Sequence, residues 1–208
     1  QMLYLLALGL RDDIAVKLLN LGIGLLLAGA VYLYGRTFAD RATGAWAAVI
    51  VLTTEAVAMT LTRVMIDATT ALFSFLALFA IALWDRGECR EPRLLALAGL
   101  LGGLGLSTKY TTFWLWAIML AAVAVLALQR RRGVKAAIGS AALAGGISLA
   151  VLLPWLVKTW AWSGNPVFPF FFDLLGGGPW DTWAQTSTGP PWASWAWEPS
   201  GWRLPSGP

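Results

Sequence analysis

The sequence predicts an all-α protein, a polytopic transmembrane helix bundle of about six spans. Of its 208 residues, 58% are hydrophobic and 12% are charged, whereas a typical soluble domain has about 25% charged residues. The mean hydropathy is +0.68. Because so few charges cannot cover the surface of a water-soluble domain of this size, a bilayer is the expected solvent.

Apolar runs between charge clusters mark the expected helices. They lie at about 14–34, 44–62, 68–84, 94–108, 111–128 and 136–157. Most of them reach the roughly 17 to 25 residues that cross a hydrocarbon core about 30 Å thick. The fourth run is short and contains GLLGGLGL, so we expect a helix that tilts little, breaks or re-enters.

The segments on either side of the bundle have a different composition. We expect residues 1–13 to be the end of an extracytoplasmic loop or an interfacial segment, 14–157 to be the transmembrane bundle, and 158–208 to be an extracytoplasmic segment rich in Trp, Pro and Gly. Tryptophans concentrate after residue 154, which is typical of anchoring at a membrane interface. We also expect the sequence to be a fragment of a longer protein, and inactive by itself.

Basic residues predict how the bundle is oriented. If the loops alternate between two sides, one side holds these residues in three short loops: Arg36, Arg41, Arg86, Arg90, Arg93, Arg130, Arg131, Arg132 and Lys135. The positive-inside rule makes this side cytoplasmic. The net charge of +4 is therefore a topology signal, and we expect no nucleic-acid partner.

Two residue types limit the possible chemistry. The sequence has no histidine, which excludes histidine-based acid or base catalysis and Ser-His or Cys-His nucleophiles within it. Its single cysteine, Cys89, excludes an internal disulfide and a cysteine-based zinc site. Catalysis would depend on carboxylates, Lys, Arg, Tyr and amides.

Charges near the outer ends of the spans are the candidate functional residues, because a charge at mid-bilayer costs on the order of 2.5 to 3.5 kcal/mol. Arg63 and Asp67 stand four residues apart, so they would share one face if this segment were helical. They form either an interfacial ion pair or a site where Asp67 binds a divalent cation or orients a substrate. Glu55, inside the second run, is expected to face the bundle interior and pair with a neighbouring helix.

Lys109 stands in LSTKYTT, at another outer turn. Its ammonium either extends to the membrane interface or binds a phosphate. The residues around it bear hydroxyl groups, an unusual cluster in so apolar a chain: Ser107, Thr108, Tyr110, Thr111 and Thr112.

The order of these features resembles the membrane domain of GT-C glycosyltransferases, the group of protein O-mannosyltransferases and lipid A aminoarabinose transferases. The segments that carry the resemblance are DIAVKLLNLGIGLLLAGAVYLYGRTFADRATG, TRVMIDATTALFSFLALFAIALW, GLLGGLGLSTKYTTFWLW and LPWLVKTWAWSGNPVFPF. It covers roughly residues 3–172.

The resemblance implies a multi-pass enzyme of the plasma or inner membrane, with its active side extracytoplasmic. It would move a sugar, with inversion, from a polyprenyl-phosphate donor to a lipid, glycan or protein acceptor. Asp67 matches an acidic position implicated in activity or metal binding, which makes a divalent metal ion a candidate cofactor. Lys109 matches a basic position, and with Arg63 and Tyr110 is a candidate for binding the lipid phosphate. The main catalytic base is expected upstream of Gln1.

Two other functions remain open from the sequence. A transporter would account for Glu55 and for a broken fourth helix, but it predicts an internal repeat, and none is convincing between 14–84 and 94–157. A non-catalytic membrane subunit is the third possibility.

Overall fold

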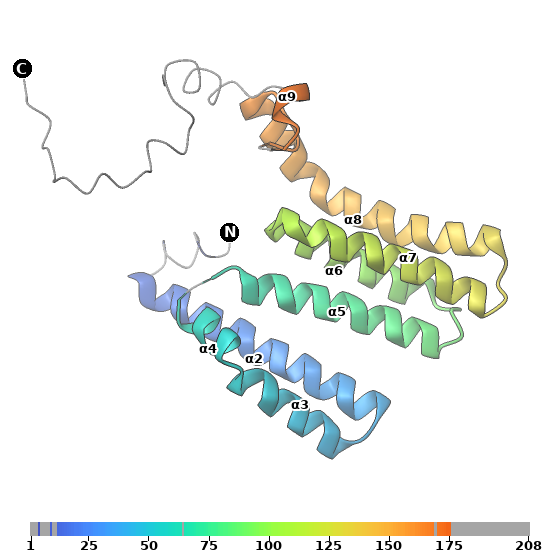
Figure 1. The fold of residues 1–208 in the computed structure, drawn as a ribbon, viewed down its shortest axis with the longest axis horizontal. Coiled ribbons are helices and arrows are strands. Elements are labelled where there is room, and N and C mark those ends of the chain that lie inside the picture. The colour runs from blue at the N-terminus through green and yellow to red at the C-terminus, as the bar shows by residue number, and fades with distance from the viewer. Residues whose placement is uncertain (1–3, 5–8, 10–11, 64, 169, 176–208) are drawn as a thin grey trace, which may run out of the picture. The chain divides into compact units, whose positions relative to one another are not determined.

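The computed structural model describes residues 4, 9, 12–63, 65–168 and 170–175. Regular structure in these residues is entirely helical (Figure 1). The chain divides into two units, residues 1–154 and 155–208. The helices are α2 (Asp12–Phe38), α3 (Arg41–Thr53), α4 (Glu55–Thr62), α5 (Asp67–Arg86), α6 (Pro92–Thr108), the 3-10 turn η1 (Tyr110–Thr112), α7 (Phe113–Gln129), α8 (Val134–Ser163) and α9 (Phe172–Leu175).

Each of the six predicted runs forms helix in the described residues, so the predicted all-α, multi-pass architecture is confirmed. Helices α2, α5, η1 with α7, and α8 are each long and apolar enough to cross a membrane. The pair α3 and α4 adds a fifth crossing if it counts as one span. Helix α6 has 17 residues, about 25 Å at 1.5 Å per residue, and is shorter than these. The total of six spans stays a prediction.

The second apolar run is not the single helix that the sequence predicts. It breaks at Thr54, whose backbone is extended, and α3 and α4 are bent by 60°. The Thr53 hydroxyl donates to the Val49 carbonyl at 2.8 Å, and the Thr54 hydroxyl to the Ile50 carbonyl at 2.7 Å. Threonine hydroxyls that bond back to the preceding turn favour bending of a helix, and two stand in succession here.

Helix α6 is continuous, contrary to the predicted tendency of its glycines to break it. The glycines instead let α8 approach closely. A Cβ on Gly99 would lie 2.5 Å from the Ala144 carbonyl oxygen, and one on Gly103 would lie 2.7 Å from that of Ser148. The Ser148 hydroxyl donates to the Gly99 carbonyl at 2.8 Å. Small residues four apart are a common means of packing helices in a membrane, where the hydrophobic effect does not drive association.

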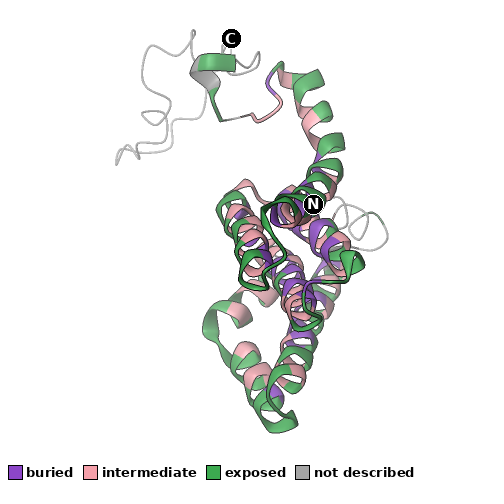
Figure 2. Ribbon diagram, turned by 90° about the vertical axis from the view of Figure 1, so that its right-hand side faces the viewer, coloured by how far each residue is buried: buried purple, intermediate pink, exposed green. Residues whose placement is uncertain are grey.

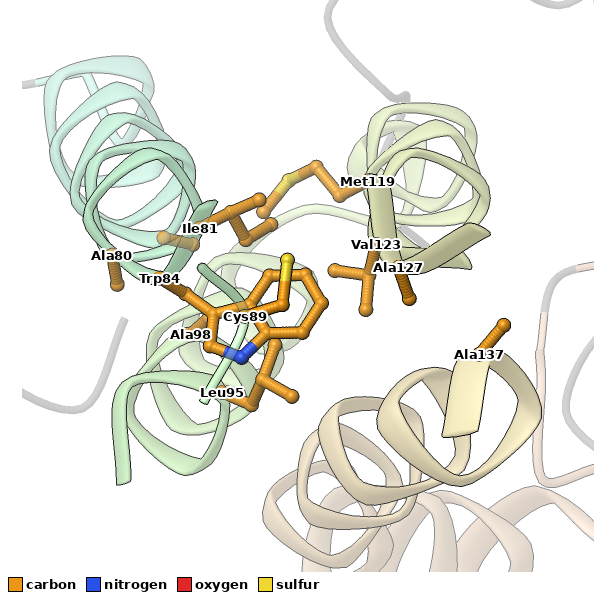
Figure 3. Packing of buried hydrophobic residues seen from close by; sticks show 11 residues of the cluster. Ala80, Ile81, Trp84, Cys89, Leu95, Ala98, Met119, Val123, Ala127 and Ala137 are labelled. Atoms are coloured by element: carbon orange, nitrogen blue, oxygen red, sulfur yellow. The ribbon is translucent and has the colours of Figure 1, made fainter. Parts of the chain in front are cut away.

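Buried apolar side chains form a core between α5, α6, α7 and α8 (Figure 3). Its largest member is Trp84, which is only 1% exposed. The core consists of Ala77, Ala80, Ile81, Trp84, Cys89, Leu95, Ala98, Met119, Val123, Ala127 and Ala137. A second cluster of Ile23, Leu27, Ala68 and Leu72 joins α2 to α5.

Many helix residues are exposed (Figure 2), and large apolar side chains are among them. Trp114 is 75% exposed and Leu26 is 64% exposed. In a water-soluble protein such surfaces would be a liability, whereas in a membrane protein they face lipid.

Helix α8 continues beyond Pro154 into the second unit and ends at Ser163, just before Gly164, which has a φ of +74°. The following turn is held by Asn165, which is fully buried. Its amide nitrogen donates to the Phe170 carbonyl at 2.9 Å, and its Oδ1 accepts from the Val167 N–H at 3.0 Å. The Trp-rich region expected to follow lies outside the described residues.

Candidate functional site

Two turns meet at one end of the first unit, the turn between α4 and α5 and the turn between α6 and η1 (Figure 1). Lys109 Nζ lies 2.7 Å from Asp67 Oδ1. These two candidate residues are 42 positions apart, and the structure joins them in an ion pair. Their side chains are 41% and 47% exposed, respectively, so the pair remains accessible from outside the bundle.

The helix ends favour the charges of this pair. Asp67 is the first residue of α5, where the helix dipole favours a carboxylate. Lys109 follows the last residue of α6, where the dipole favours a cation. One turn further along, the hydroxyl oxygens of Thr70 and Thr108 are 2.8 Å apart. The two helices are therefore tied together twice at this end.

The position of the α4–α5 turn depends on Asn20, a residue that sequence analysis did not single out. Asn20 is fully buried, and its Nδ2 donates to the carbonyls of Thr60 at 2.8 Å and Leu61 at 3.0 Å. These carbonyls are in the last turn of α4, where no helical N–H remains for them. Asn20 thus caps α4 from within α2. A lone amide inside an apolar run was the signal that could have found it.

Tyr4 extends this network to α5. Its hydroxyl donates to Asn20 Oδ1 at 2.8 Å and lies 3.0 Å from the Thr69 hydroxyl. Since Thr69 is two residues beyond Asp67, the network fixes the first turn of the helix that presents the carboxylate.

Arg63 does not share a helix face with Asp67, as the four-residue spacing suggested. It caps the end of α4, whereas Asp67 begins α5. Within the described residues Arg63 is exposed and forms no ion pair. The turn between the helices separates the two side chains, and Lys109 takes the place expected of Arg63.

Tyr110 begins η1 and is half-buried beside Lys109 in the chain. In the same turn Thr112 is 8% exposed, and its hydroxyl has no hydrogen-bond partner in the described part of the chain. The structure therefore places a cation and an unpaired buried hydroxyl at the start of α7.

Glu55 is exposed in the first turn of α4, which contradicts the prediction that it faces the bundle interior. The break at Thr54 is the cause, because it places Glu55 in the first turn of a new helix. Of the two features that suggested a transporter, the broken fourth helix is absent, since α6 is continuous, whereas Glu55 lies just after the bend of the α3–α4 pair.

The divalent metal ion considered for Asp67 stays a prediction. No group of three His, Cys, Asp or Glu side chains gathers in the described residues, and Asp67 offers one carboxylate that Lys109 already contacts. Mg²⁺ is often held by one or two carboxylates together with water and substrate phosphates.

The three basic loops lie together at the opposite end of the unit (Figure 1). Arg86, at the end of α5, donates to the Thr37 carbonyl near the end of α2. Arg130, after α7, binds Asp85 through Nε at 2.8 Å and Nη2 at 2.9 Å, and this pairing raises the pKa of the Arg130 guanidinium. Three basic loops at one end of the unit agree with the prediction that these loops lie on the same side of the membrane. Which side of the membrane it faces stays a prediction.

Comparison with known proteins identifies the family. Residues 3–158 match the model of the dolichyl-phosphate-mannose-protein mannosyltransferase family. The chain belongs to this family. No curated protein and no solved structure matches it significantly.

Membership in the mannosyltransferase family confirms the resemblance to GT-C glycosyltransferases. With the apolar helices, it places the chain among the multi-pass membrane glycosyltransferases. The match includes Arg63, Asp67, Lys109 and Tyr110.

Proposed function

We propose that the protein transfers a sugar of the mannose class from a polyprenyl-phosphate carrier to an extracytoplasmic glycan, lipid or protein, with inversion at the anomeric carbon. Family membership supports the class of reaction. The observation that carries the site is the Asp67–Lys109 pair, held between two helix ends and accessible from outside the bundle.

Lys109 is suited to hold the phosphate of the carrier. Its ammonium is a compact cation with three donors, of which one contact goes to Asp67. The helix that begins just after it, η1 with α7, directs N–H groups toward the same turn, and helix N-termini bind phosphates. Tyr110 and Arg63 would provide further donors at this end.

Asp67 has two functions in this proposal. Through Oδ1 it orients Lys109. Its second oxygen, Oδ2, has no donor among the described residues, so it can accept a hydrogen bond from a sugar or acceptor hydroxyl. The carboxylate would then touch the substrate as well as its phosphate-binding partner.

The reaction requires one bond to form and one to break. An acceptor hydroxyl oxygen bonds to the anomeric carbon, and the bond from that carbon to the phosphate oxygen breaks. The electron pair leaves with the polyprenyl phosphate, whose charge Lys109 stabilises. The acceptor proton passes to a carboxylate, the class of base open to a sequence without histidine. No step is assigned to a metal ion.

The test uses the full-length enzyme and a polyprenyl-phosphate mannose donor with a radiolabelled sugar. Asp67→Asn keeps the size of the side chain but removes its charge, and we expect transfer to fall by about 100-fold or more. Glu55→Gln is the matched control, because it neutralises an exposed carboxylate on the adjacent helix. It should stay within about twofold of wild type, as remote surface changes do.

Unchanged transfer by a normally expressed Asp67→Asn enzyme would contradict the proposed site. If the wild-type enzyme transfers no label from this donor but does so from a carrier with another sugar, the mannose assignment is wrong and the site is tested with that donor.

A further inference from the structure

The basic end of the first unit contains a concavity that the proposed function does not use. It has a volume of about 430 Å³ and is lined by Glu88, Arg90, Arg130 and Arg132. These residues come from two loops, one between α5 and α6 and one between α7 and α8. We propose that this concavity binds the phosphodiester headgroup of an anionic membrane lipid.

Charge and geometry support a singly charged anion. Asp85 holds Arg130 through two hydrogen bonds, and Glu88 lies 2.9 Å from Arg90. Three guanidinium groups thus face two carboxylates, which leaves one net positive charge. Arg132 forms no ion pair in the described part of the chain, so its planar donors remain for a phosphate.

The two loops are fixed in shape. After α5, the Cys89 N–H bonds to the Trp84 carbonyl at 2.9 Å, and after α7, the Arg132 N–H bonds to that of Ala127 at 3.1 Å. Cys89 and Arg131 have left-handed backbones, with φ of 58° and 55°, and Cys89 packs in the core. A preorganised set of arginines loses less conformational entropy on binding than mobile side chains.

The surroundings favour a lipid over a soluble phosphate compound. Leu128 and Val134, on either side of the α7–α8 loop, are 47% and 65% exposed. Both belong to helices that are apolar enough to span a membrane. Exposed apolar residues beside a basic concavity match a ligand that joins acyl chains to a phosphate, and basic pockets between transmembrane helices bind lipid headgroups.

The test is retention of phosphatidylglycerol by the purified full-length protein, measured by native mass spectrometry in a mixture with phosphatidylethanolamine. Arg90→Gln with Arg132→Gln should weaken retention by more than about tenfold. The matched control is Arg36→Gln with Arg41→Gln, which removes the same charge from the third basic loop and should keep the bound lipid. Equal loss in both double variants would show a general charge effect and overturn the proposal.

Two further arms complete the test. Arg132→Gln alone breaks no ion pair in the described residues, so its folding is secure, and it should also lose the lipid; full retention would contradict the proposal. Inorganic phosphate is the probe for a soluble ligand. If it binds this concavity and phosphatidylglycerol does not, the lipid assignment is wrong.

Discussion

Two ion pairs join helices at opposite ends of the first unit, and they differ in how much of their bonding capacity they use. Arg130 and Asp85 form a two-point contact beside the buried core, with Asp85 27% exposed. Lys109 and Asp67 share one contact of 2.7 Å, and both side chains are more than 40% exposed. The first pair uses both carboxylate oxygens, whereas the second keeps one oxygen and further N–H groups for a ligand. The Arg130–Asp85 pair therefore has little bonding capacity left beyond holding the helices together, whereas the Lys109–Asp67 pair keeps the groups that the proposed function requires.

The largest expected effect on stability is at the basic end. Trp84→Ala removes the largest side chain of the core, which is 1% exposed, and should lower the free energy of unfolding by about 3 to 5 kcal/mol. The loss comes from packing, because the unfolded chain stays in lipid or detergent. The melting temperature can be followed by the labelling of Cys89 with a maleimide during heating, because this buried thiol reacts only when the core opens. A melting temperature equal to that of wild type would mean that this core does not hold the helices together.

At the end of the unit that holds Asp67 and Lys109, here called the polar end, substitutions should affect activity more than stability. Lys109→Gln should reduce sugar transfer by about 100- to 1,000-fold, the range for losing a group that stabilises developing charge. Thermal stability should change little, since exposed pairs contribute about 0 to 1 kcal/mol. Measuring the transfer rate and the melting temperature of the same variant separates the effect on activity from the effect on stability. A variant that loses stability and activity together would make this pair structural, like the one at the other end.

Asn20→Leu tests the network behind the polar end. It leaves the Leu61 carbonyl without its donor and the Thr60 carbonyl with only the 3.4 Å bond from the Met65 N–H, at a cost of about 1 to 3 kcal/mol. Transfer should also fall, because the turn before Asp67 loses its anchor. Asn20→Asp replaces the amide by a carboxyl group, which offers these carbonyls at most one donor and only when protonated, so it should also weaken the turn. Hydrogen exchange at the α4–α5 turn measures how far the turn loosens. Unchanged exchange would contradict the role of Asn20 in positioning this turn.

The smallest effect concerns Asp40 at the basic end. It caps α3, and its bonds to the Thr43 N–H and hydroxyl lower its pKa below the ordinary value of 3.8. A lowered pKa in the folded state gives stability that is complete above about pH 4 and lost as the pH falls through the folded pKa. The difference in melting temperature between wild type and Asp40→Ala should therefore shrink below pH 4. A constant difference down to pH 2 would contradict this.

How far the sequence predicted the molecule depends on the range of the interaction. The helices followed from apolar runs and charge clusters, which are local signals. The break at Thr54 did not, because it depends on back-bonding of two hydroxyls that also occur in continuous helices. The candidate residues Asp67 and Lys109 were found as charges at span ends. Their pairing was missed, since spacing in one segment suggested Arg63 and nothing local links positions 42 residues apart.

In the proposed function, Asp67 and Lys109 each contact substrate and do more than bind one another. The most direct test is the transfer rate of the full-length Asp67→Lys, Lys109→Asp double variant beside each single substitution. The swap preserves the attraction but exchanges the positions of carboxylate and ammonium. We expect the double variant to fold like wild type and to transfer sugar no faster than the single variants. Recovery of transfer toward the wild-type rate would contradict it, because the pair would then be only a link between helices.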